Sequence, residues 1–331
     1  MTVTVKAWCR VDLAGGTLDI WPLGLFHPQA RTVNLAIDLA VSVELRRIAA
    51  GYRVHQGGGT VEARTAAELA AAPESALIGV AAEALALSPF EVTLASESPR
   101  GGGLGASSAL TVAFLTAAEE AFDLPRSEAR ARAALARDLE ARLMSLPTGM
   151  QDHYPALLGG ALEIRPLPGG EQVRRLDADL EALAASLVVV YSGQSHFSAG
   201  NNWQVVRRRL DGEPGITALF EGIAAAAAEL VPALEAGDLP RVGELMSREW
   251  SHRRQLAEGI STPVLEALLA AGAAQGAWGG KACGAGGGGC LALLGPPERR
   301  GAIAAALEAA GGRVLRARPT GMPLEVSFDD L

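Results

Sequence analysis

The stretch PRGGGLGASSA, residues 99–109, lies between a strand-like run and a long helical pattern. Residues 90–96 (FEVTLAS) alternate apolar and polar side chains, and residues 106–122 are rich in Ala, Leu and Val. Glycines let backbone N–H groups turn toward one point, and the following helix adds free amides and the positive end of its dipole. This glycine loop (residues 99–109) is therefore a predicted anion site, with an ordinary helix cap after a flexible turn as the plainer interpretation.

Other nucleotide-binding motifs fit the sequence poorly. Residues 101–106 match a loose dinucleotide fingerprint, but they open about a hundred residues into the chain. Residues 284–289 match the strict fingerprint, but they lead into the apolar run at residues 290–294, where that fingerprint requires a helix. A P-loop needs Gly-Lys-Ser/Thr after its glycines, and neither cluster has it.

The length and composition of the chain exclude several classes of protein. The chain has 331 residues, enough for about two domains of ~150 residues each. With 49% hydrophobic and 20% charged residues it is expected to fold around a large core, which excludes disorder over most of its length. A net charge of −8 disfavours a nucleic-acid partner, because such binding depends on lysines and arginines that neutralise phosphates.

Targeting and cysteine patterns point to a cytoplasmic protein. The N-terminus has no apolar segment after Lys6, and no apolar stretch reads as a membrane span. The cysteines Cys9, Cys283 and Cys290 are odd in number and lack metal-ligand spacing, so they are expected to be reduced core thiols. The oligomeric state is not readable from the sequence.

Strand and helix patterns alternate irregularly in both halves of the chain. Strands are expected at residues 41–48, 187–191 and 290–294, among others, and helices at residues 126–144 and 238–257. This mixture predicts an α+β fold in two domains with a boundary near residue 180.

Three motifs in order resemble the GHMP kinases, and the resemblance covers nearly the whole chain. They are the first motif (RVDLAGGTLD, residues 10–19), the glycine loop, and the third motif (GGKACGAGGGGC, residues 279–290). The resemblance implies a two-domain GHMP kinase fold. Residues 1–180 would form an N-terminal ribosomal-protein-S5-like domain with the phosphate loop, and residues 181–331 a C-terminal ferredoxin-like domain.

Further details resemble the sugar 1-kinase branch, in particular D-glycero-D-manno-heptose 7-phosphate kinases and fucokinase-like enzymes. They are the pair Gly15-Gly16 with Asp19, the segment TGMQDHY at residues 148–154, and WSHRR at residues 250–254. Galactokinases are expected to show Gly-Glu-His before the sugar-binding aspartate, and here Gly-Gly-Thr-Leu stands instead, so galactose is a doubtful substrate. The resemblance implies an ATP- and Mg²⁺-dependent kinase that phosphorylates a sugar or sugar phosphate at the anomeric hydroxyl.

The resemblance also implies roles for single residues. Asp152 would accept the proton of the attacking hydroxyl beside the cation Arg10, and Asp19 with Gly15 and Gly16 would bind the sugar. Glu140 and a loop hydroxyl would hold Mg²⁺; Ser107 matches that hydroxyl, with Ser108 as the alternative. The expected ATP-binding residues are Gly101, Gly102, Gly103, Leu104, Gly105, Ala106, Ser107 and Ser108, and the glycines of the third-motif loop are Gly284, Gly286, Gly287 and Gly288.

Two other functions stay open. One keeps the family but changes the acceptor to mevalonate or homoserine, although Asp19 would repel a carboxylate. The other is a non-catalytic sugar or nucleotide sensor on the same fold, which would have no need for Asp152. If the acceptor carries a distal phosphate, an arginine must bind it, and the candidates are Arg31, Arg100, Arg253 and Arg254.

Overall fold

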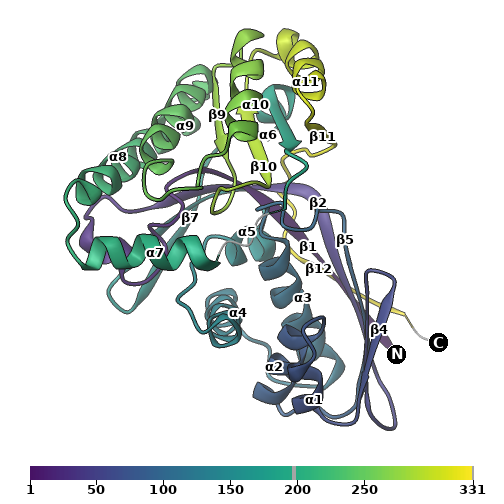
Figure 1. The fold of residues 1–331 in the computed structure, drawn as a ribbon. Helices are drawn as coiled ribbons and strands as arrows, with labels where there is room; N and C mark the ends of the chain where they lie inside the picture. Colours follow the sequence, from purple (N-terminus) through teal and green to yellow (C-terminus); the bar gives the residue numbers. More distant parts are fainter. Residues whose placement is uncertain (196–198, 330–331) are drawn as a thin grey trace.

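The computed structural model describes residues 1–195 and 199–329 and contains two sheets with their helices (Figure 1). The larger sheet has the strand order β12-β1-β2-β5-β3-β4, and β6 joins it at β2 and carries β7. Its strands are β1 (Thr2–Ala14), β2 (Thr32–Arg47), β3 (Tyr52–Gln56), β4 (Gly59–Ala63), β5 (Phe90–Ser96), β6 (Ala161–Leu167), β7 (Gly170–Arg175) and β12 (Glu325–Asp329).

The smaller sheet has the order β11-β8-β10-β9. Its strands are β8 (Leu187–Tyr191), β9 (Gly279–Ala282), β10 (Cys290–Leu294) and β11 (Arg313–Leu315). The helices are α1 (Ala66–Ala71), α2 (Ala76–Ala84), α3 (Ala106–Ala121), α4 (Ala129–Met144), α5 (His153–Leu158), α6 (Leu180–Ser186), α7 (Ala199–Leu210), α8 (Ile216–Glu235), α9 (Leu239–Arg253), α10 (Pro263–Ala274) and α11 (Arg300–Ala309), with short 3-10 turns η1 (Leu23–Phe26) and η2 (Pro297–Arg299).

The predicted α+β architecture is confirmed, and the strand, glycine loop and helix lie where the sequence places them. β5, β8 and β10 have the predicted bounds, and α3 ends one residue earlier than predicted. β2 is longer than the predicted strand at residues 41–48, because its first half pairs with both β1 and β6. That half is buried almost throughout, so it lacks the alternation that marks a strand with one solvent face.

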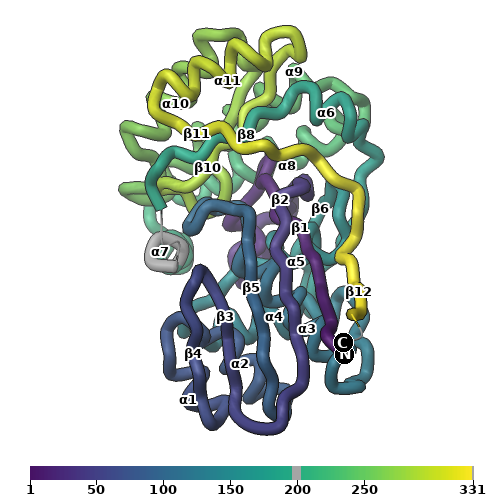
Figure 2. Tube along the Cα trace, turned by 90° about the vertical axis from the view of Figure 1, so that its right-hand side faces the viewer, coloured from purple at the N-terminus to yellow at the C-terminus, as the bar shows by residue number. Residues whose placement is uncertain are grey.

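The last strand of the chain returns to the first sheet. β12 pairs antiparallel with β1, so the first and last strands of the described chain lie side by side (Figure 2). The proposed division at residue 180 falls at the start of α6, after β7 of the larger sheet and before β8 of the smaller one. β12 comes after this division in the chain but belongs to the larger sheet. The domain ranges therefore stay a prediction, with the last strand belonging to the first sheet.

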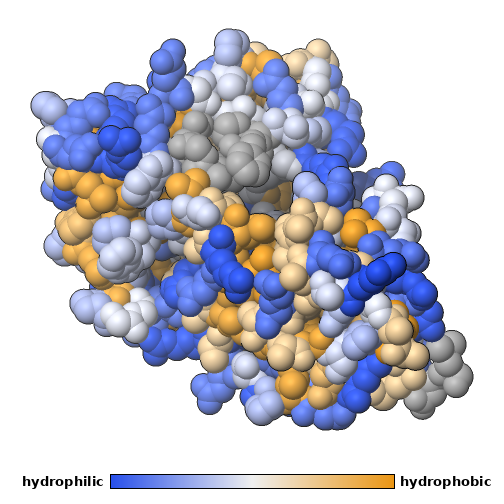
Figure 3. Space-filling view, turned by 60° about the horizontal axis from the view of Figure 1, so that its bottom comes forward, coloured by the Kyte–Doolittle hydropathy of each residue, from blue (hydrophilic) through white to orange (hydrophobic). Residues whose placement is uncertain are grey.

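Two large hydrophobic cores hold the sheets and helices together, and α8 contributes to both. Ile216 and Phe220 pack in the smaller core, whereas Leu230 and Leu234 pack in the larger one. By length and composition alone, α8 could cross a membrane. This is weak evidence for a membrane span, because a core helix whose apolar face packs against other elements meets the same criteria. On the face shown in Figure 3, hydrophilic side chains lie between the apolar patches.

Candidate active site

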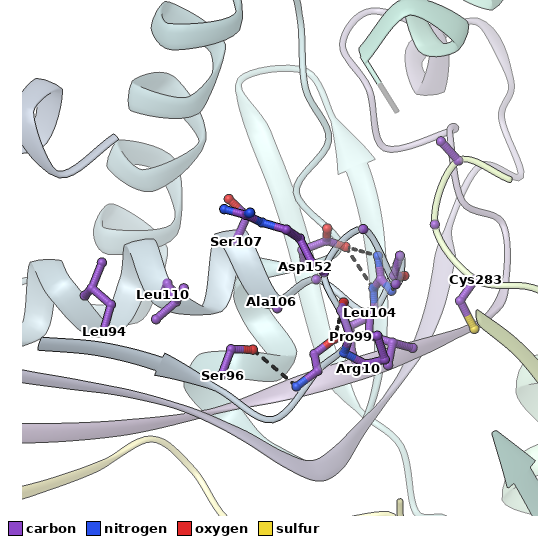
Figure 4. Close-up of a pocket in the computed structure, with 18 of the residues that line it drawn as sticks. Arg10, Leu94, Ser96, Pro99, Leu104, Ala106, Ser107, Leu110, Asp152 and Cys283 are labelled. Carbon is purple, nitrogen blue, oxygen red and sulfur yellow. Dashed lines mark hydrogen bonds and ion pairs between the residues drawn. The ribbon is translucent and has the colours of Figure 1, made fainter. Parts of the chain in front are cut away.

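A cavity of about 1340 Å³ lies where the three motifs meet. Its wall is formed by residues from the first motif, the glycine loop, the segment before α5 and the third motif (Figure 4). Of the predicted site residues, those in the wall are Arg10, Asp19, Gly101, Gly102, Gly103, Leu104, Gly105, Ala106, Ser107, Asp152, Gly284, Gly286 and Gly288. The predicted residues outside the wall are Gly15, Gly16, Ser108, Glu140 and Gly287.

The glycine loop packs directly against the third motif. Gly103 has a φ of +69°, and a Cβ added there would lie 2.6 Å from the carbonyl oxygen of Cys283. The backbone N–H of Cys290 donates to the carbonyl oxygen of Gly102 over 2.8 Å. Gly105, with a φ of +74°, is the N-cap of α3, so the loop ends at the N-terminus of a 16-residue helix. Backbone therefore approaches backbone here, and the helix start opens toward the cavity.

Arg10 and Asp152 form an ion pair in the cavity wall and point toward one another, and two N–H groups of Arg10 donate to the same oxygen, Oδ1 (Figure 4). Arg10 Nε donates to Asp152 Oδ1 over 2.8 Å, and Arg10 Nη1 donates to the carbonyl oxygen of Gly103 over 2.6 Å. Burial alone lowers the pKa of Arg10, but Asp152 and Asp12 outweigh it, so the pKa is raised and the guanidinium stays charged. The side chain of Asp152 is 26% exposed, which leaves this carboxylate accessible from the cavity.

Asp19 is a buried carboxylate in the same wall with an unused oxygen. Its Oδ2 accepts the backbone N–H groups of Met150 and Gln151 over 2.7 and 2.9 Å. Its Oδ1 has no hydrogen-bond partner within residues 1–195 and 199–329. Burial, together with the charge of Asp152, raises the pKa of Asp19 despite these two backbone bonds. Such an oxygen is suited to a donor that arrives with a ligand.

Replacing Asp19 with asparagine should raise the Tm of the ligand-free protein at pH 7. The raised pKa means that the folded protein binds a proton at Asp19 more readily than the unfolded chain does. Between the unfolded value and the raised folded value, the free energy of unfolding therefore increases as the pH falls. The variant should lack this component. Thermal melts of both proteins from pH 4 to pH 8 test this; a variant with a lower Tm and the same pH slope contradicts it.

Gly15 and Gly16 lie behind the wall, against buried charges and backbone. A Cβ at Gly15, whose φ is +88°, would lie 1.9 Å from the carbonyl oxygen of Arg31. A Cβ at Gly16 would lie 2.4 Å from both Arg253 Nη1 and Asp12 Oδ2. Close packing beneath the cavity therefore accounts for these glycines, and neither residue lines the cavity wall.

Glu140 lies next to the start of α3, where Ser108 and Thr111 hold it. Ser108 Oγ donates to its Oε2 over 3.0 Å, and Thr111 Oγ1 donates to its Oε1 over 3.1 Å. His153 Nε2 lies 3.4 Å from Oε2, and although burial lowers the pKa of His153, Glu140 raises it above its usual value. Ser107, which the sequence paired with Glu140, is exposed on the cavity wall instead.

The donor set at this point fits Mg²⁺. Carboxylate and hydroxyl oxygens are the hard ligands that Mg²⁺ prefers, and the ion usually keeps several waters and binds substrate phosphates. Across the described parts of the chain, no group of three or more His, Cys, Asp or Glu side chains could hold a metal. Glu140 with a loop hydroxyl therefore suits a metal that arrives with phosphates, rather than a metal held by protein ligands alone.

Sequence reasoning missed a buried cluster of charges beneath the cavity. Its members are Asp12, Glu249, Arg253 and Lys281, which are 0 to 2% exposed. Asp12 and Lys281 stand inside otherwise apolar strand segments, and this pattern could have marked them as buried. Glu249 and Arg253 are one turn apart on α9, so in the sequence they look like an ordinary surface ion pair.

The three cysteines are free and buried, as predicted. Burial is the main cause that raises the pKa of Cys9, to about 12.

The turn between β3 and β4 also lines the cavity, through Gly57, Gly58 and Gly59. No role was predicted for these glycines from the sequence.

Two sequence families match the chain: the GHMP kinases N terminal domain over residues 70–160 and the GHMP kinases C terminal domain over residues 230–313. A mevalonate kinase of Pyrococcus abyssi is 30% identical over 242 residues, covering 71% of this chain and 68% of that protein. A D-glycero-alpha-D-manno-heptose 7-phosphate kinase of Campylobacter jejuni is 26% identical over 236 residues, covering 68% and 67%.

Solved structures share the fold at low identity. A mevalonate kinase superposes with a TM-score of 0.75 at 20% identity, covering 96% of this chain and 99% of that one. A D-glycero-D-manno-heptose 1-phosphate kinase from Bacteriodes thetaiotaomicron superposes with a TM-score of 0.77 at 20% identity, covering 99% and 100%. With the motifs, the two-sheet fold and the matched sequence families in agreement, the chain belongs to the GHMP kinases, a family of phosphotransferases that use ATP.

Proposed function

We propose that this kinase transfers the γ-phosphoryl group of ATP to the anomeric hydroxyl of a sugar or sugar phosphate. The choice of a sugar as acceptor is based on Asp19, because its Oδ1 accepts no hydrogen bond from any described residue. A sugar brings several hydroxyl donors, whereas a carboxylate acceptor would bring a further negative charge to a wall that already holds Asp19 and Asp152. Arg10 and Arg253, the buried cations of the wall, already pair with Asp152, Asp12 and Glu249.

In this proposal the glycine loop binds the phosphates of ATP. The glycine loop and the first residues of α3 line the cavity, and the N-terminus of a helix favours negative charge. Mg²⁺ would be held by Glu140 and the hydroxyl of Ser108, which contacts Glu140, rather than by Ser107, and it would supply charge neutralisation for the phosphates. Ser108 and Thr111 orient Glu140.

Asp152 is the proposed base for the acceptor hydroxyl. Its Oδ1 is occupied by Arg10, which fixes the carboxylate and keeps a positive charge beside the group being transferred. The base accepts the proton as the phosphoryl group moves, so its position matters more than its basicity in water. Asp19 holds other hydroxyls of the sugar and so orients the reacting one.

A distal phosphate on the acceptor has one free candidate partner among the four arginines that the sequence offers. Arg31 pairs with Glu163 and Arg254 with Glu266, and both lie outside the cavity wall. Arg253 lines the cavity but is held by internal partners. Arg100 lines the cavity and is exposed, so we propose that it contacts such a phosphate.

A mevalonate-type acceptor is the second candidate, because a mevalonate kinase is 30% identical to this chain over 242 aligned residues. An assay that couples ADP release to NADH oxidation should separate the two, with heptose 7-phosphate, fucose, mannose, galactose, mevalonate and homoserine as acceptors. The expected result is the highest kcat/KM with a sugar or sugar phosphate. A higher kcat/KM with mevalonate or homoserine overturns the choice of acceptor. ADP binding without turnover on any acceptor favours the sensor.

A further inference from the structure

The buried charged cluster beneath the cavity joins three distant segments of the chain. Asp12 comes from β1, Glu249 and Arg253 from α9, and Lys281 from β9. Lys281 Nζ lies 2.9 Å from Asp12 Oδ2 and 3.1 Å from Glu249 Oε1. Arg253 Nη1 lies 3.3 Å from the same two oxygens. The two acids and two bases balance, and no step of the proposed transfer uses them.

The positive charges of the cluster are strong enough to keep Asp12 ionised. Burial alone raises the pKa of Asp12, but Lys281 and Arg253 outweigh it and lower the pKa below its usual value. Burial alone lowers the pKa of Arg253, but Glu249 and Asp12 outweigh it, so the pKa is raised and the guanidinium stays charged. Each charge therefore depends on the others, because an unpaired charge at this depth is costly.

Lys281 belongs to the third motif, and Arg253 gives the cluster a second contact with it. Its Nη2 donates to the carbonyl oxygen of Gly284 over 2.7 Å. A Cβ at Gly284 would lie 3.0 Å from both Cα and the carbonyl oxygen of Gly103, so the two loops are in contact. The same oxygen of Gly103 accepts Arg10 Nη1, and Arg10 binds Asp152. A continuous path of contacts runs from the cluster through both glycine loops to the proposed base.

We propose that this cluster is a positioning network that holds the third motif against the glycine loop and thereby sets the affinity for nucleotide. The inference rests on the proposed role of the glycine loop as the phosphate site. The four charged side chains can pair well in one arrangement, because each charge needs its partners at this depth. This arrangement fixes the position of the Arg253 guanidinium. The Gly284 carbonyl that this guanidinium holds sets how closely the third motif approaches the glycine loop.

Two substitutions weaken the network while keeping it close to its native shape. Arg253→Lys keeps the charge but loses the planar fork that reaches Asp12, Glu249 and the Gly284 carbonyl together. Glu249→Gln keeps the shape and removes one of the two acids. The matched control is Arg254→Lys, at the neighbouring residue, because Arg254 is exposed and pairs with Glu266.

Isothermal titration with MgADP tests the proposal without any acceptor. Both network variants should bind MgADP about 10-fold more weakly than wild type, a change typical of coupled contacts, and Arg254→Lys should stay within about twofold. A purely structural role would lower Tm and leave the Kd of the folded protein unchanged.

Wild-type Kd values in the folded network variants overturn the proposal. If Arg253→Lys does not fold, Glu249→Gln decides the question. A wild-type protein that binds no MgADP overturns both this inference and the phosphate role of the glycine loop. A wild-type protein that binds MgADP but phosphorylates no sugar contradicts the proposed acceptor alone.

Discussion

Asp152→Asn should lower turnover roughly 10²–10⁴-fold while the affinity for MgADP stays at the wild-type value. Asparagine keeps an oxygen that can accept the N–H groups of Arg10, but it cannot take up the proton of the acceptor hydroxyl. Asp152 is the N-cap of α5, yet its side chain makes no capping hydrogen bond, so the helix should not lose stability. The loss should therefore fall on the chemical step.

Steady-state rates with the best acceptor, together with MgADP titrations, measure the two effects separately. Asp123→Asn is the matched control, because Asp123 is exposed and pairs with Arg47 on the surface. The control should show wild-type turnover. Full turnover in Asp152→Asn would remove Asp152 from the role of base.

Gly103→Ala should weaken the binding of MgADP by roughly 100-fold, equivalent to about 2.7 kcal/mol. The new Cβ would meet the carbonyl of Cys283 at 2.6 Å, and this contact is with backbone, which cannot rotate away. Alanine at a φ of +69° adds strain of its own. The glycine loop and the third motif should therefore separate.

Gly169→Ala is the control for strain alone. Gly169 also has a positive φ, +84°, but a Cβ there would meet nothing within 4 Å. It should lower Tm slightly and leave the Kd for MgADP unchanged. Equal Kd values for Gly103→Ala and wild type would show that the glycine loop does not bind nucleotide.

The sequence predicts those parts of the fold and site in which neighbouring residues carry the signal. The glycine loop, β5 and α3 are a local pattern, and each lies where it is predicted. Arg10 and Asp152 are separated by 142 positions, and their pairing was predicted through the resemblance to a family. The spacing of Arg10 and Asp152 in the sequence does not by itself predict that the two residues are in contact.

The missed features depend on contacts between distant segments. Glu249 and Arg253 read as a surface pair until α9 is packed against β1 and β9. Ser107 and Ser108 are neighbours with the same chemistry, and only the direction of the first turn of α3 turns Ser108 toward Glu140. The length of β2 was underestimated because its first half is buried almost throughout, and a strand buried on both faces loses its alternating pattern.

The most direct test of the proposed activity is the ³¹P NMR spectrum of the product formed from ATP and the best sugar acceptor. We expect a phosphate whose phosphorus couples to the anomeric proton, and we expect Asp152→Asn to form this product far more slowly than the wild type. A phosphate on another hydroxyl contradicts the anomeric assignment. Phosphorylation of mevalonate in preference to every sugar contradicts the role given to Asp19.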